Sequence, residues 1–432
     1  MRTSAKHFSI IEHGGFIESP QSVVGYTSLP AHTFRALEDL ILQNLDDTGK
    51  TDAIELFALS SKRSVGKVIT ARNYVGVVVM KDGTTIEILP KIHGAEDSLE
   101  KTRDIFFQML RSLRIAPFKE FNSARLKSGR LNIFEVFVSM FVSEAMTLCK
   151  QGLKASYVTT QKNERFFKGK LMASEHLRHN LFNHERFYLE YDEFSLNRPE
   201  NRLLKSALRL LLSLSQDVSN RQRIRRLLSS FDRVPFSSNH AADFERCFSS
   251  RETKHYERAL SWCKVFLRGD SFTSFPGSYV AIALLFPMET IFEQFIAAKL
   301  KRIVGNNARC ITQDRNHYLF NLPTKVFALQ PDLVIEAGNR VFVMDTKWKI
   351  LSGVGSTLGV SQADMYQMYT YAKKYSSTRT ILIYPKSATK NIDNGLCFRS
   401  KDNVSVDIVF VDLLDTDNCL RSLLMDRCGM FL

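Results

Sequence analysis

The first hundred residues of this chain combine strand patterns with one helical pattern. Residues 73–80 and 85–89 are rich in Val and Ile and predict two strands, with Asp82-Gly83 as the turn between them. Residues 29–44 carry apolar side chains at helical spacing and predict a helix. We therefore expect a β-rich amino-terminal domain over residues 1–100.

A mostly helical pattern follows. Residues 133–148 are strongly apolar and free of Gly and Pro, and residues 201–214 repeat Leu at helical spacing. Polar and breaker residues predict a loop at 237–243 and a linker at 272–278. We expect a helical middle region over residues 101–275.

Residues 276–432 alternate between helix and strand patterns. In chain order, the pattern predicts a helix at 287–303, strands at 326–329, 332–336 and 340–347, a helix at 362–374, strands at 378–384 and 404–411, and a short terminal helix. The whole chain is thus predicted to be an α+β multidomain protein, with a mixed central sheet in its carboxy-terminal α/β domain.

Composition agrees with a globular protein of more than one domain. The chain has 432 residues, of which 44% are hydrophobic and 24% are charged. No apolar run approaches the roughly 20 residues of a membrane span, and the start does not read as a secretory signal. The seven cysteines form no CxxC pair, so we expect no disulfide framework and a cytoplasmic location.

The positive charge is concentrated in one part of the chain. The net charge is +14, made of −3 in residues 1–100, +20 in residues 101–400 and −3 in the remainder. Such a basic region favours a polyanionic partner, with nucleic acid first among the candidates. A generally basic surface is the alternative.

Two acidic residues and a lysine form the sharpest chemical signal. Asp332 begins one predicted strand, and Asp345 and Lys347 end the next, with a tight turn between the strands. The pairing would bring both carboxylates to one end of the sheet, and residues two apart on a strand share a face. Two carboxylates can hold Mg²⁺, and a lysine can orient water and offset charge, so the set suits phosphodiester hydrolysis. The alternative without a catalytic role is an exposed hairpin in which these charged residues form salt bridges.

This Pro-Asp…Asp-x-Lys arrangement resembles the PD-(D/E)XK nuclease superfamily. The resemblance implies a metal site of Glu293, Asp332 and Asp345, with Glu293 supplied by the preceding helix and Glu289 as a second choice there. It also implies site roles for Gln367 and Tyr371, which match a QxxxY element. Glu293 could instead be a solvated helix residue, and Gln367 and Tyr371 an ordinary helix face. Trp348 is expected to pack in the core.

More narrowly, the chain resembles the McrC family, the nuclease subunit of modification-dependent McrBC restriction systems. The matching stretches are 75–80, 83–92, 152–157, 167–171, 345–349 and 364–371. The resemblance implies a Mg²⁺-dependent DNA endonuclease that cuts double-stranded methylated DNA. It further implies that the amino-terminal domain engages a hexameric ring of an McrB-like AAA+ GTPase and stimulates GTP hydrolysis. The chain has no GxxxxGK[ST] loop of its own, so we expect it not to bind GTP.

Two other functions remain open at this point. The chain could be a stand-alone nuclease of the same superfamily, acting in repair or restriction. It could also be a non-catalytic activator of an AAA+ motor. The intact Asp332, Asp345 and Lys347 set argues against the activator, which has no need of it.

Overall fold

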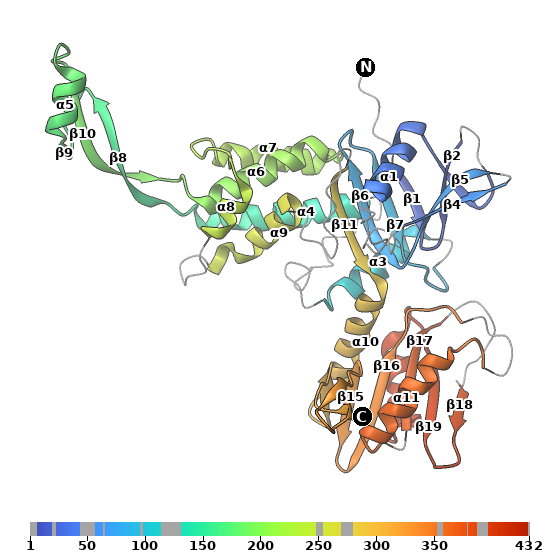
Figure 1. Cartoon of the computed structure of the whole chain (residues 1–432). Coiled ribbons are helices and arrows are strands. Elements are labelled where there is room, and N and C mark those ends of the chain that lie inside the picture. Colours follow the sequence, from blue (N-terminus) through green and yellow to red (C-terminus); the bar gives the residue numbers. More distant parts are fainter. Residues whose placement is uncertain are drawn as a thin grey trace. The chain divides into compact units, whose positions relative to one another are not determined.

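The computed structural model describes residues 7–19, 23–43, 57–63, 65–95, 98–113, 131–247, 254–268, 280–351, 357–377, 379–386 and 396–430. The chain divides into two compact units (Figure 1). One is built mainly on Phe134–Asp270. The other combines Lys6–Met80, Thr84–Ile133 and Ser271–Leu432.

One sheet joins amino-terminal strands to a strand from far along the chain. Its order is β1-β7-β6-β11, with β1 at His7–Ile11, β6 at Tyr74–Met80, β7 at Thr85–Leu89 and β11 at Val280–Pro287. The β6–β7 hairpin is confirmed, since the two strands pair antiparallel and Gly83 has a φ of 84°. A Cβ at Gly76 of β6 would lie 2.0 Å from the Leu284 carbonyl oxygen of β11, so the close approach of these strands requires glycine there.

A second sheet and a helix complete the β-rich amino-terminal part. The sheet order is β3-β2-β5-β4, with β2 at Gly15–Glu18, β3 at Tyr26–Leu29, β4 at Phe57–Lys62 and β5 at Gly66–Ala71. The predicted first helix is confirmed as α1, Ala31–Gln43, and it buries Phe34 and Leu37. The helix α3, Leu99–Leu110, follows the β6–β7 hairpin.

The unit built on Phe134–Asp270 combines a helical body with a β-ribbon. The helices are α4 Ile133–Gln151, α6 Pro199–Leu214, α7 Val218–Ser230, α8 His240–Glu245, the 3₁₀ turn Lys254–Tyr256 and α9 Glu257–Arg268. Phe137 and Phe141 of α4 pack against Trp262 and Phe266 of α9. A long ribbon extends from this body and bears a short helix at its far end (Figure 1, green). Its elements are β8 Ser156–Glu164, β9 Lys170–Leu171, α5 Ala173–Asn180 and β10 Phe187–Ser195.

The carboxy-terminal part is a six-stranded mixed sheet with three helices. The sheet order is β12-β15-β16-β17-β19-β18, and β17 pairs in parallel with both β16 and β19. The strands are β12 Arg309–Thr312, β15 Leu333–Ala337, β16 Arg340–Thr346, β17 Arg379–Pro385, β18 Leu396–Arg399 and β19 Ser405–Val411. The helices are α10 Met288–Val304, α11 Gln362–Lys374 and α12 Thr416–Asp426. A separate hairpin pairs β13, Tyr318–Phe320, with β14, Val326–Ala328.

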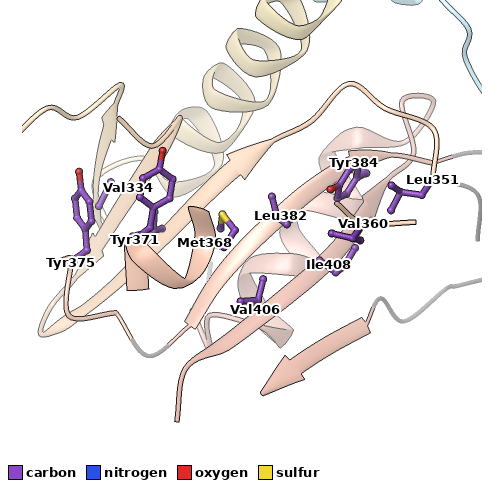
Figure 2. Close-up of a cluster of buried hydrophobic side chains, with 11 residues drawn as sticks. Val334, Leu351, Val360, Met368, Tyr371, Tyr375, Leu382, Tyr384, Val406 and Ile408 are labelled. Atoms are coloured by element: carbon purple, nitrogen blue, oxygen red, sulfur yellow. The ribbon is translucent and has the colours of Figure 1, made fainter. Parts of the chain in front are cut away.

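A buried apolar cluster fixes α11 to the face of this sheet (Figure 2). Met368 and Tyr371 of α11, with Tyr375 directly after it, pack with Leu382 of β17 and Val406 of β19. Burial of this helix face holds the backbone of α11 in place. Polar residues on the same helix, such as Gln367, are therefore held at defined positions.

Several sequence predictions need correction. The middle region is not only helical, because the ribbon strands β8 and β10 lie within it. The loop predicted at 237–243 is wrong in its second half, where Asn239 caps the start of α8. The strand β12 was missed, and β14 lies outside the central sheet. The linker predicted at 272–278 falls outside the described residues.

The domain boundary predicted at residue 276 separates two strands that pair with each other. The strand β11 lies within the range 276–432 that was assigned to the nuclease, yet it pairs with β6 of the amino-terminal sheet. The division into three domains stays a prediction. None of the described helices is both long enough and apolar enough to cross a membrane.

Candidate active site

The two predicted aspartates lie opposite each other at one end of the central sheet. Leu333 of β15 is paired with Met344 of β16 in an antiparallel register. Asp332 and Asp345 are the next residues outward, so the register brings them together. The backbone N–H and the hydroxyl of Thr346 both donate to Asp332 Oδ2 at 2.7 Å, which holds that carboxylate in place.

Lys347 connects this acidic pair to α11. Its Nζ makes an ion pair with Asp345 Oδ2 and lies 3.4 Å from Gln367 Oε1. Gln367 in turn donates to the Tyr371 hydroxyl at 2.8 Å. The Lys347 N–H donates to the Ile383 carbonyl oxygen at 2.9 Å and continues the β16–β17 pairing past the end of the strand. Lys347, Gln367 and Tyr371 thus form one continuous polar chain beside Asp345.

Burial dominates the electrostatics of the acidic pair. It raises the pKa of Asp345 to about 6, and the nearby Asp332 charge raises it further while Lys347 opposes the shift. Burial also raises the pKa of Asp332, against the hydrogen bonds from Thr346. The pKa of Lys347 is raised because the two aspartates outweigh its own partial burial. This is a site with excess negative charge that one lysine only partly offsets.

Glu293 is linked to the pair through a residue that the sequence analysis missed. Gln313 Nε2 lies 2.5 Å from Glu293 Oε1 and 3.5 Å from Asp332 Oδ1. Gln313 directly follows β12 and has a φ of 53°, a left-handed conformation that is uncommon for this residue type. No local pattern marks it, because only the pairing of the short strand β12 with β15 places Gln313 next to Asp332. Glu289, the second candidate on α10, is exposed.

A hollow of about 540 Å³ opens beside Asp332. Gln367, Tyr371 and Tyr366 of α11 line one part of it, and Gln313 and Asp332 another. The remaining lining residues are Thr370 of α11 and four from the segment before Asp332, namely Leu319, Ala328, Leu329 and Gln330. The hollow therefore gives a ligand access to Asp332 and Gln367, whereas Asp345 and Lys347 lie behind its lining.

Comparison with known proteins decides the family. Residues 69–385, more than half of the chain, match the family model described as McrBC 5-methylcytosine restriction system component. The chain belongs to the McrBC family. None of the curated proteins matches it.

A chain in a solved McrBC assembly has a similar fold. One match is to a chain in the refined half-complex from the tetradecameric assembly of Thermococcus gammatolerans McrB AAA+ hexamers with bound McrC. At 20% sequence identity it covers 98% of this chain and 100% of that chain, with a TM-score of 0.71. Another, to the cryo-EM McrBC complex of the same organism, covers 70% of this chain and 88% of that chain at 22% identity, with a TM-score of 0.49.

The residues of this McrBC-family chain offer a partial fit to a divalent cation. Asp345 Oδ2 is buried and has no hydrogen-bond partner of good geometry, although it is close to Lys347. Two adjacent carboxylates with raised pKa values are hard oxygen donors in need of positive charge. The described residues contain no group of three or more His, Cys, Asp or Glu side chains arranged to hold a metal ion. Asp332 and Asp345 thus suit a cation whose remaining ligands are other oxygen atoms. Glu293 instead accepts a hydrogen bond from the Gln313 amide.

Trp348 connects the site to the amino-terminal strands. Its ring packs against Phe292 of α10 at 5.4 Å between centroids, and its Nε1–H donates to Glu12 Oε2 at 2.9 Å. Glu12 directly follows β1 and is buried. Burial raises its pKa to about 7, and the negative charge of Glu289 adds to the shift. Trp348 is thus half-buried against α10, and a polar contact joins it to a residue more than 300 positions earlier.

Proposed function

We propose that this chain is the Mg²⁺-dependent DNA endonuclease subunit of an McrBC-type, modification-dependent restriction system. The observation that carries the proposal is the grouping of Asp332, Asp345 and Lys347 beside an open hollow. Membership of a family of restriction-system components is consistent with it. The layout of the central sheet with α10 and α11 suits the PD-(D/E)XK core that the motif resembles.

Each residue has a role that follows from its contacts. Asp332 and Asp345 would hold Mg²⁺, which when bound would polarise the scissile phosphate and acidify a water. Lys347 holds its proton firmly, so it can orient the attacking water and offset charge that develops on the phosphate. Gln367, steadied by Tyr371, positions Lys347. Gln313 positions Glu293 relative to Asp332.

The partner would be an McrB-like AAA+ GTPase hexamer. The similar Thermococcus gammatolerans structure consists of McrB AAA+ hexamers with bound McrC. We propose the same association here, with GTP hydrolysis supplied by the partner and with double-stranded methylated DNA as the substrate.

The test uses the full chain with its purified partner, GTP, Mg²⁺ and methylated or unmethylated plasmid. We expect cleavage of the methylated plasmid only. Asp345→Asn should abolish cleavage while stimulation of the partner's GTP hydrolysis persists. Asp402→Asn is the matched control, because it removes an exposed carboxylate that pairs with Lys373 in the same part of the chain, and it should cut at the normal rate.

Three outcomes would change the assignment. Normal cleavage by Asp345→Asn rejects the assigned site. Cleavage without partner and GTP favours the stand-alone nuclease. Stimulated GTP hydrolysis with no cleavage under any condition favours the non-catalytic activator.

A further inference from the structure

The β13–β14 hairpin adjoins the candidate site and exposes large apolar side chains. Phe320, Leu322 and Phe327 are 54%, 85% and 70% exposed. The same hairpin contributes Leu319 and Ala328 to the lining of the hollow that contains Asp332. Its apolar residues are therefore presented next to the place where a phosphodiester would bind.

Packing within the hairpin does not bury these apolar side chains. The rings of Phe320 and Phe327 meet edge to face with 6.2 Å between centroids, yet both remain mostly exposed. Phe327 has a φ of 59°, which is an outlier for a bulky side chain. Strained backbone conformations of this kind are found mainly at functional sites, where the conformation serves binding and its cost in free energy persists.

The charge of the hairpin suits a polyanion. Residues 315–330 include Arg315 and Lys325 and contain no Asp or Glu. Lys325 Nζ lies 5.7 Å from the centre of the Tyr318 ring, and Arg315 Nε donates to Gln330 Oε1 at 3.0 Å. Cations interleaved with exposed aromatic and aliphatic side chains are typical of surfaces that contact phosphates and bases together.

We propose that the β13–β14 hairpin is a base-contacting wedge for double-stranded DNA at the candidate active site. Arg315 and Lys325 contact phosphates, while Phe320, Leu322 and Phe327 press against bases and open a base step beside the scissile phosphate. The assignment rests on the proposed endonuclease function, because the shared hollow is what selects DNA over a protein partner. Opening a step frees the backbone to bend toward Asp332 and Asp345.

Binding to a fluorescent duplex tests the wedge without requiring cleavage. The probe is a DNA duplex with 2-aminopurine at successive positions, mixed with the full-length chain without Mg²⁺. We expect the wild-type chain to raise the fluorescence at one step, as a base unstacks. Leu322→Ser with Phe327→Asn should remove that rise and weaken binding about 10-fold. Asparagine is chosen because it tolerates the left-handed backbone at position 327.

Two controls separate the wedge from general effects. Phe236→Ser removes an exposed ring outside the hairpin and should leave the fluorescence and the binding unchanged. Lys325→Gln should keep the fluorescence rise. The slope of the logarithm of affinity against the logarithm of salt concentration should become shallower by about one, because one phosphate contact is lost. Both hairpin variants should keep the wild-type Tm, since their side chains are exposed.

The results that overturn the proposal are distinct from those that overturn the endonuclease. The wedge is rejected if the hairpin variants bind and unstack DNA normally, or if the wild-type chain unstacks no base. It is also rejected if the variants change only the stimulation of the partner's GTP hydrolysis, which would make the hairpin a protein-docking surface. If unstacking depends on the hairpin but the wild-type chain with its partner never cuts DNA, the wedge stands and the endonuclease function fails.

Discussion

At the scale of single residues, the candidate site is held by polar contacts that offset only part of the negative charge of its carboxylates. Asp332 is held by Thr346, Asp345 by Lys347, and Glu293 by Gln313. Asp332 and Glu293 also share Gln313, so a change at one of these residues can affect both carboxylates. The most informative residue is Gln313, because it touches two acidic groups and occurs in no recognisable motif.

Replacing Gln313 tests whether it positions the acidic residues. Gln313→Ala removes the amide between Glu293 and Asp332, and we expect DNA cleavage to fall about 10-fold or more, as is usual when a supporting residue is lost. Cleavage rates under single-turnover conditions measure the effect. Asn418→Ala, an exposed amide on α12 that bonds to Asp415, is the control and should have no effect. A wild-type rate for Gln313→Ala would show that this contact is incidental.

Glu12 makes stability depend on pH. Its pKa is raised from 4.5 to about 7 in the folded chain, mainly by burial, so between these values the folded chain keeps a proton that the unfolded chain has released. The free energy of unfolding should therefore fall as the pH rises from 4.5 to 7, by on the order of 3 kcal/mol. His13 and Glu289 are the titratable side chains nearby, and Glu12 accepts hydrogen bonds from Trp348 and from the backbone of Lys91.

Glu12→Gln should remove that contribution. The amide oxygen still accepts from Trp348, but no proton is released, so the variant should be more stable than wild type above pH 7. Urea unfolding at several pH values measures the difference. Glu18→Gln, a partly exposed control on β2, should retain the wild-type profile. Parallel pH profiles for wild type and Glu12→Gln would contradict the raised pKa.

At the scale of elements, the β8–β10 ribbon departs furthest from what the pattern predicted. The two strands pair over nine residues, and α5 and β9 lie near their far end (Figure 1). Phe166 and Phe182 there are 80% and 93% exposed. Monomeric proteins seldom expose several large apolar residues in one small element, and such surfaces usually bind partners.

We expect this ribbon end to contribute to binding the AAA+ partner. Phe166→Ser with Phe182→Ser should leave the Tm unchanged and reduce the stimulation of GTP hydrolysis several-fold, because exposed anchors carry much of the energy of an interface. Titrating the variant against a fixed amount of partner gives both affinity and maximal rate. Phe236→Ser on the helical body serves again as control. Unchanged stimulation of GTP hydrolysis would indicate that the amino-terminal domain alone binds the partner.

At the scale of the whole molecule, one strand links parts of the sequence that the pattern separates. The strand β11 pairs with β6 along its length and then continues into α10, which carries Glu293. Met288 at the start of α10 donates to the Asn73 carbonyl oxygen at 2.9 Å. The amino-terminal sheet therefore sets where the acid-bearing helix begins.

Truncation tests this dependence. A chain ending at residue 275 lacks β11 and should expose the edge of β6, so we expect it to unfold at a lower temperature and to aggregate more than a chain ending at Val304. Thermal unfolding followed by circular dichroism compares the two. Equal Tm values would mean that the amino-terminal sheet is complete without β11.

The elements of the fold were predictable to different degrees. The β6–β7 hairpin and the helices α1, α10 and α11 follow from local patterns, because periodicity and turn residues act over short distances. The ribbon was missed although β10 carries aromatic and aliphatic residues typical of a strand, because its partner β8 is mostly polar. The strand β12 was missed because four residues are too few for a period to show.

The sequence by itself determined which chemistry is possible: the spacing of Asp332, Asp345 and Lys347 around one tight turn requires a shared end of two strands. Only the tertiary structure decided what surrounds them. Gln313 and Glu12 reach the site through contacts between distant segments, and burial raises the pKa of Glu12. The exposed β13–β14 hairpin contributes to the hollow beside Asp332. The physical reason is that strand pairing and desolvation depend on which segments meet in space, and no local pattern of side chains contains that information.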